Sequence, residues 1–202
     1  MPSRAFVVTL LAVAASLAIA VPAYAGDPAT NLSEHVAAVF KTLQDPELQS
    51  PDKDTERRLA VRRIVDDLFD FNETARRALG RHWTERSAAE QDRFVHLFTD
   101  LIDRAYLRRV DRYDGEQVVV LGSAVQGDEA TVLTKVVTRD NSQIPVDYLM
   151  ARTPDDRWRV WDVKIGGMSL VGSYRAQFNK IIIGESYDEL VRRLEAKVSA
   201  QP

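Results

Sequence analysis

Residues 157–178 read RWRVWDVKIGGMSLVGSYRAQF. The first half alternates between apolar and polar residues, with Trp161, Val163 and Ile165 expected on one face. This period of two predicts a half-buried strand. Gly166–Gly167 then ends the strand at a point where the backbone needs conformational freedom or a close approach.

From Ser169 onward the apolar residues follow a helical period instead. Leu170, Tyr174, Phe178 and Ile181 fall at i, i+4, i+8 and i+11, which forms one apolar stripe along a helix. A strand and a helix therefore meet at the double glycine, and both present bulky apolar groups to the same side. Such an arrangement can close a packed core or line a cavity.

The same stretch carries a family resemblance. The pattern WxVWDVxIxGMSLVxxYRxQF over residues 158–178 resembles the C-terminal signature of the MlaC-type periplasmic phospholipid-binding proteins, the toluene-tolerance lipid-transport family of ABC transporter auxiliary components. The resemblance continues upstream through FDF at 69–71, ALGxxW at 78–83 and the helix expected at 94–106, and covers roughly residues 30–198. Gly166 and Thr74 depart from the family pattern, which bears on pocket shape and lipid preference.

The order of the patterns indicates an α+β fold. Amphipathic helices are expected first: one from Leu32 to Leu43, one ending near Leu68, a short one capped by Asn72 and ended by Gly80, and a long one opened by the capping box Ser87–Glu90. Four hairpin-connected strands should follow: 118–125, 130–138, a third with Val146, Tyr148 and Met150 on one face, and a fourth between the turn at 154–156 and Gly166. A tight turn is expected at Gly127–Asp128. We expect a four-stranded antiparallel curved sheet, C-terminal helices packed across it, and an apolar cavity between sheet and helices.

The first 25 residues have the pattern of a secretory signal peptide. Arg4 precedes an apolar run from Ala5 to Val21, and Ala23–Ala25 forms a small-x-small cleavage site. This leader holds one of the 27 basic and none of the 30 acidic residues, so its removal would leave 177 residues, 26–202, with a net charge of −4. We expect these to form a single domain that needs no disulfide, since the chain has no cysteine. The acidic balance argues against nucleic acid as a partner.

The sequence offers no catalytic set. The three histidines, His35, His82 and His96, lack a second ligand at metal-binding spacing, and no nucleophile elbow or phosphate loop occurs. The acidic cluster of Asp66, Asp67 and Asp70 fits helix capping or a solvated face better than acid–base chemistry. We therefore expect no enzyme activity, no metal and no cofactor.

Many apolar side chains are expected to point between the sheet and its helices. Periodicity cannot separate a packed core from a cavity, and only the resemblance implies a cavity for lipid tails. The candidate cavity residues are Phe69, Leu79, Trp83, Phe98, Leu101, Tyr106, Tyr148, Met150, Val163, Ile165, Met168, Leu170, Val171, Tyr174 and Phe178. Lys164 and Arg175 are candidates for a mouth that meets the head group.

The resemblance implies a monomeric periplasmic carrier of phospholipid. Such a carrier would move lipid between an inner-membrane Mla-type ABC transporter complex and an outer-membrane lipoprotein–porin complex, and so maintain outer-membrane lipid asymmetry. Three alternatives stay open: a carrier of hopanoid or other polycyclic lipid, an enzyme with a polar pair inside the pocket, and an adaptor domain. An adaptor would have a solid core, with any cavity below about 300 Å³.

Overall fold

The computed structural model describes residues 26–106, 113 and 115–200. The predicted signal peptide, residues 1–25, lies outside them. The helices are α1 (Pro28–Leu43), α2 (Asp54–Leu68), α3 (Phe71–Leu79), α4 (Ala88–Tyr106), α5 (Leu170–Gly184) and α6 (Tyr187–Ser199), with short 3₁₀ turns at Pro46–Leu48, Pro51–Lys53 and Gly80–Glu85. No helix in this part of the chain combines the length and the apolarity that a bilayer span requires.

One antiparallel sheet follows α4 in the chain. Its strands are β1 (Gln117–Gln126), β2 (Glu129–Val137), β3 (Gln143–Arg152), β4 (Trp158–Ile165) and β5 (Met168–Ser169), in spatial order β1-β2-β3-β4-β5. The sequence predicted four strands, and the fifth is a two-residue return strand. It forms because Gly166 (φ 57°) and Gly167 (φ 83°) both take positive φ and make a tight turn that pairs Ile165 with Met168. The need at this turn is conformational, since a Cβ on either glycine would meet nothing within 4 Å.

A β-bulge in β4 changes which residues share a face. Met150 pairs with Val160 and Leu149 with Asp162, so Trp161 has no opposite residue. The expected alternation, with Trp161 beside Val163 and Ile165, is therefore wrong. Trp161 instead lies under the guanidinium of Arg77, 3.7 Å from the ring centroid, while Val163 and Ile165 face the opposite side.

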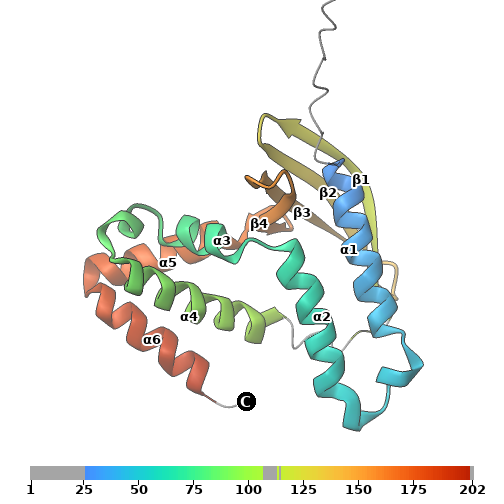
Figure 1. Ribbon diagram of the computed structural model, residues 1–202, viewed down its shortest axis with the longest axis horizontal. Coiled ribbons are helices and arrows are strands. Elements are labelled where there is room, and N and C mark those ends of the chain that lie inside the picture. Colours follow the sequence, from blue (N-terminus) through green and yellow to red (C-terminus); the bar gives the residue numbers. More distant parts are fainter. Residues whose placement is uncertain (1–25, 107–112, 114, 201–202) are drawn as a thin grey trace, which may run out of the picture.

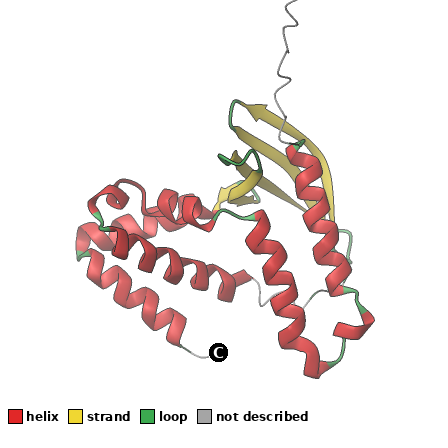
Figure 2. Ribbon diagram, viewed as in Figure 1, coloured by secondary structure: helices red, strands yellow, loops and turns green. Residues whose placement is uncertain are grey.

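The helices form two groups around the sheet (Figures 1 and 2). Helices α1 and α2 lie against one face, here called the inner face, with α1 over β1 and β2 and α2 against β4. Helices α3, α4, α5 and α6 pack on one another beside the sheet, and α5 reaches β4. Of the C-terminal helices, α5 packs against the sheet at β4, whereas α6 packs on α4 and α5.

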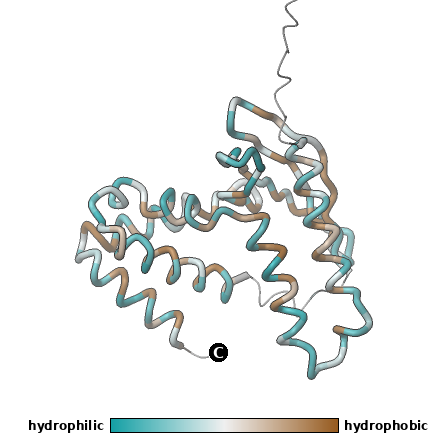
Figure 3. Tube along the Cα trace, viewed as in Figure 1, coloured by the Kyte–Doolittle hydropathy of each residue, from teal (hydrophilic) through white to brown (hydrophobic). Residues whose placement is uncertain are grey.

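Each group closes its own core. The helical core consists of Ala75, Ala78, Leu79, Phe94, Phe98, Val171, Phe178, Tyr187, Leu190, Val191 and Leu194. The sheet core consists of Leu32, Leu68, Ala130, Val132, Met150, Trp158 and Val160. Apolar and polar stretches alternate along α1 and α2, as expected for helices that bury one face (Figure 3).

Local signals set most helix boundaries. Ser87 and Glu90 form the predicted capping box of α4, with the Ser87 amide donating to the Glu90 carboxylate over 2.8 Å. Gly80 ends α3 at φ 61°, also as predicted. The α3 cap is Asp70, whose carboxylate accepts from the Glu73 amide at 2.9 Å, and not Asn72. Asp70 is the cap because its backbone carbonyl also accepts the first hydrogen bond of the helix, from the Thr74 amide.

A buried carboxylate joins the sheet to the helical group. Asp162 is 3% exposed and accepts hydrogen bonds from the Val171 amide (2.9 Å) and the Ser169 hydroxyl. Ser169 in turn caps α5 by accepting from the Gly172 amide over 2.7 Å. The strand that ends at the double glycine and the helix that begins after it are therefore held together by one side chain.

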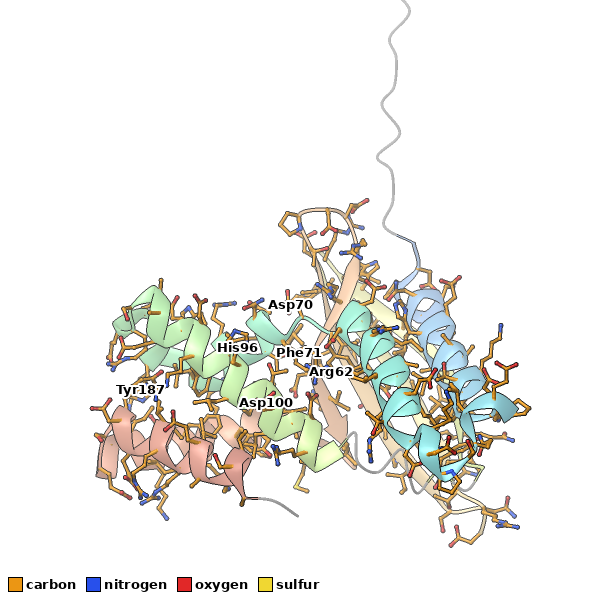
Figure 4. All side chains as sticks on the ribbon, turned by 60° about the horizontal axis from the view of Figure 1, so that its bottom comes forward. Arg62, Asp70, Phe71, His96, Asp100 and Tyr187 are labelled. Carbon is orange, nitrogen blue, oxygen red and sulfur yellow. The ribbon has the colours of Figure 1, made fainter. Side chains whose placement is uncertain are left out.

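Replacing Asp162 with alanine should lower the free energy of unfolding by about 2–3 kcal/mol, because it leaves the buried Val171 amide and the half-buried Ser169 hydroxyl without their acceptor. Urea denaturation followed by circular dichroism measures this change. The control is Asp100→Ala on the exposed side of α4 (Figure 4), expected to change stability by less than about 0.5 kcal/mol. Equal effects of the two variants would contradict the joining role of Asp162.

Candidate functional site

An apolar cavity of about 330 Å³ lies between the inner face of the sheet and helices α1 and α2. The sheet contributes Val118, Val146, Tyr148, Val163 and Ile165. Val146 pairs with Ile165 and Tyr148 with Val163, so these four side chains share one face of β3 and β4. The facing helices contribute Val36, Val39, Phe40, Ile64, Val65 and Leu68.

The side of the cavity that faces the helical group is also apolar. Phe69 and Phe71 flank the break between α2 and α3 and stack with ring centroids 5.7 Å apart. Ile102 near the end of α4 and Leu170 at the first turn of α5 complete this wall. The space can therefore accept hydrocarbon, and burial of hydrocarbon there is favourable by about 25 cal/mol per Å² of apolar surface.

His35 is one of three polar side chains in the lining. Its ring nitrogens lie 2.8 Å from the Asn31 carbonyl oxygen and 3.1 Å from the Asp67 carboxylate, so the imidazole links α1 to α2. The hydrogen bond from His35, aided by Arg157, lowers the pKa of Asp67 below its ordinary value. Both nitrogens are thus used to hold the two cavity helices together.

Asp103 is the second polar side chain in the lining and is 15% exposed. Its carboxylate pairs with the guanidinium of Arg62, which also donates to Asp66 over 2.6 Å and lies 5.6 Å from the centroid of the Phe71 ring. Figure 4 shows Arg62 and Phe71 directed toward one another between α2 and the helical group. This pair ties α2 to α4 across the edge of the cavity.

The cavity includes only part of the predicted set: Phe69, Tyr148, Val163, Ile165 and Leu170. The structure places Leu79, Phe98, Val171 and Phe178 in the helical core, with Trp83, Leu101 and Tyr174 packed against it. Ring contacts fill that region, since Phe98 meets Tyr174 and Phe178 edge-on at 5.0 and 5.3 Å. A lipid-binding role for these residues stays a prediction, and they do not border the cavity as it stands.

Met150 belongs to the sheet core and is fully buried, whereas Met168 is 74% exposed at the β4–β5 turn. The side chain of Tyr106 lies outside the described part of the chain. Of the two candidate mouth residues, Lys164 lies opposite Asp147 and Ser169 in the sheet. Arg175 donates to the Arg77 carbonyl over 2.8 Å and packs beside Gly80, so it closes the end of α3. Neither lines the cavity.

Most lining residues outside the predicted set come from α1 and α2, and the others are Phe71, Ile102, Asp103, Val118 and Val146. Val36, Val39, Ile64 and Val65 already stand on predicted apolar helix faces, so their burial was expected. The surface on which they pack was not predicted, because periodicity gives the apolar side of a helix and does not say which sheet face that side meets.

Comparison with known proteins places the chain in a family. A family model described as MlaC protein matches residues 33–196. The chain belongs to the MlaC family. Among solved structures, the phospholipid-binding protein of Ralstonia solanacearum in complex with a phospholipid is similar, with a TM-score of 0.74 and 23% identity over 86% of this chain and 97% of that one. At this identity, the similarity shows that this MlaC-family chain and the Ralstonia solanacearum protein share a fold. No match is found among the curated proteins.

The Arg62–Asp103 pair predicts an asymmetric mutational effect. Arg62→Met should cost about 2–3 kcal/mol of unfolding free energy, because it leaves the Asp103 carboxylate beside an apolar cavity without its cation. The double variant Arg62→Met/Asp103→Leu should recover most of that loss, since no uncompensated charge remains. Urea denaturation of both variants tests this.

The control for this pair is Arg76→Met, which breaks the exposed Arg76–Glu73 pair on α3. It should change stability by no more than about 1 kcal/mol. A double variant less stable than Arg62→Met alone would show that the pair is not the reason for the loss.

Proposed function

We propose that this chain is a periplasmic lipid carrier that holds phospholipid acyl chains in the apolar cavity and shuttles lipid between membrane complexes. The observation that carries the proposal is the cavity of about 330 Å³, bounded by apolar side chains of both the sheet and the helices, in a chain of the MlaC family. The similar fold of a protein solved with a phospholipid supports it.

The energetics suit a carrier. A two-chain phospholipid has roughly 30 methylene groups, and exposing each to water costs about 0.8 kcal/mol. An apolar cavity replaces the bilayer interior group for group, so transfer between membrane and protein is close to neutral. A carrier needs this balance, because it has to release its lipid as well as take it up. The charged head group stays in water, where its hydration is kept.

The size of the cavity implies a movement on loading. Its volume lies at the lower end of the roughly 300–1,000 Å³ that small-molecule sites occupy. A lipid with two chains is large for that range, so we expect α1 and α2 to move away from the sheet when lipid enters. The polar contacts that such a movement of α2 would strain include the Arg62–Asp103 and Arg157–Asp67 pairs and the hydrogen bonds from Arg159 to the Asp66 and Asp67 carbonyls.

The alternatives are weighed by the same geometry. An adaptor with a solid core would have a cavity below about 300 Å³, and this cavity of about 330 Å³ lies close to that bound. The carrier is favoured by the apolar lining, which both the sheet and the helices supply. An enzyme would need a reactive polar pair inside the pocket. His35 and Asp103 do border it, yet their partners are Asp67 with the Asn31 carbonyl and Arg62, respectively, and not each other. No metal-binding cluster occurs among the described residues.

A polycyclic lipid would fit the apolar lining equally well, and the ligand test below separates it from phospholipid.

The proposal includes a cellular route. Residues 1–25 would direct export and be removed, and residues 26–202 would form one lipid-binding domain. The carrier would act as a monomer between an inner-membrane Mla-type ABC transporter complex and an outer-membrane lipoprotein–porin complex, and thereby maintain lipid asymmetry. It would use no cofactor and catalyse no reaction.

Protein purified from bacterial periplasm without detergent should carry phospholipid, detected by native mass spectrometry and identified by lipid extraction. Recovery of hopanoid or another polycyclic lipid in place of phospholipid would support the alternative ligand. A protein without extractable lipid, which also takes up none from vesicles, would overturn the carrier proposal.

A cavity-filling variant gives a sharper test. Val65→Trp places a large side chain in the cavity wall formed by α2 and should reduce bound lipid at least fivefold, while the melting temperature falls by only a few degrees. The matched control is Leu59→Trp, at a 54% exposed position of the same helix, which should leave lipid content unchanged. Equal lipid content in the two variants would exclude this cavity as the binding site.

A further inference from the structure

The third polar side chain of the cavity lining is Tyr148, in the middle of β3. Its register neighbours are Val132 on β2 and Val163 on β4, so neither offers a hydrogen-bond partner from its side chain. Tyr148 faces the sheet core on one side and the cavity on the other, and remains partly accessible although its strand lies inside the sheet. The accessible part of the side chain therefore borders the cavity.

The Tyr148 hydroxyl forms no hydrogen bond with any residue that the structure describes. The other polar side chains of the lining each have a protein partner. His35 is bound by Asn31 and Asp67, and Asp103 is bound by Arg62 through Oδ2, while its Oδ1 has no hydrogen-bond partner among the described residues. Burial raises the pKa of the Tyr148 phenol above its ordinary value, so the group is neutral at physiological pH and keeps its proton to donate.

An unpaired hydroxyl in an apolar space is unfavourable, and a buried tyrosine usually finds a partner. Phenylalanine would supply the same ring to the sheet core without this cost. The presence of the hydroxyl is explained if the bound ligand supplies an acceptor for its hydrogen bond. In a phospholipid, the acceptors closest to the acyl chains are the two ester carbonyls, whereas a polycyclic hydrocarbon has none.

We propose that the Tyr148 hydroxyl donates a hydrogen bond to an acyl ester carbonyl of the bound lipid and so selects ester lipids over hydrocarbons of similar apolar bulk. The inference rests on the proposed carrier function and adds a specificity-determining residue to it. It also fixes how deep the lipid sits, since the ester region has to lie at the level of Tyr148 and the head group beyond it.

The test compares two synthetic phospholipids with the same head group and chain length, one with ester and one with ether linkages. The ether lipid keeps the phosphate and lacks the carbonyls. Wild-type protein, stripped of lipid, should bind the ester lipid about three- to tenfold more tightly in a competition followed by native mass spectrometry. Tyr148→Phe should bind the ether lipid as the wild type does and lose the preference for the ester lipid.

Tyr187→Phe is the matched control, because it removes the same atom in the helical core, where the Tyr187 hydroxyl donates to the Glu90 carbonyl over 3.1 Å. It should melt below the wild type and keep the ester preference. Tyr148→Phe should melt at or above the wild-type temperature, since no protein hydrogen bond is lost.

Two results would overturn the inference while leaving the carrier function intact. One is a Tyr148→Phe variant that keeps the ester preference. The other is a Tyr148→Phe variant that binds the ester and the ether lipid more weakly by the same factor, which would place the hydrogen-bond acceptor on the phosphate. Wild-type protein that binds neither lipid would instead remove the carrier proposal itself.

Discussion

The cavity depends on a buried carboxylate at the seam between two packed groups. Asp162 accepts from the amide of Val171 and thereby fixes the start of α5 against the end of β4. At this first turn of α5, Leu170 faces the cavity and the next residue, Val171, belongs to the helical core. Together with the hydrogen bond from the Thr74 hydroxyl to the Trp161 carbonyl, this contact holds the helical group at one edge of the sheet.

Empty space of this size in a protein lowers its free energy of unfolding. Apolar side chains that border empty space lack the packing contacts of a filled core, and a whole domain is stabilised by only roughly 5–15 kcal/mol. The helical core and the sheet core close without the cavity, which is how the fold can persist around open space. The same comparison explains why an apolar guest would be bound: it restores the contacts that the lining lacks.

Much of the fold follows from short-range signals in the sequence. The four longer strands, the Gly127–Asp128 turn, the Gly80 helix end and the Ser87–Glu90 capping box were all predictable, since each depends on the conformational preferences of a few neighbouring residues. The fifth strand could be inferred only in part, because a double glycine permits the positive φ angles of a tight turn and does not require them.

The site was harder to predict because it is set by long-range packing. The bulge at Trp161 shifts the residues of β4 before it to the other face. It places Trp161 against Arg77, which is far away in the sequence, and Asp162 against α5, which is another element. Core and cavity residues also share one chemistry. Phe98 and Val163 are both apolar at regular positions, yet one is enclosed by aromatic rings and the other borders open space. No periodicity distinguishes these two environments.

A carrier for which the free energy of lipid transfer is close to zero can make only a few polar contacts with its ligand. Every strong contact in the cavity would slow release, because each 1.4 kcal/mol of added affinity lowers the rate of dissociation about tenfold when association is unchanged. A single neutral hydroxyl contributes about 1 kcal/mol through a hydrogen bond, which is enough to rank ligands and too little to trap one. The lining fits this constraint, because the charged groups at its edge, Asp67 and Asp103, are paired with protein partners, Asp103 through one of its two oxygens. Among the described residues, Tyr148 is the polar side chain of the lining that forms no hydrogen bond to the protein.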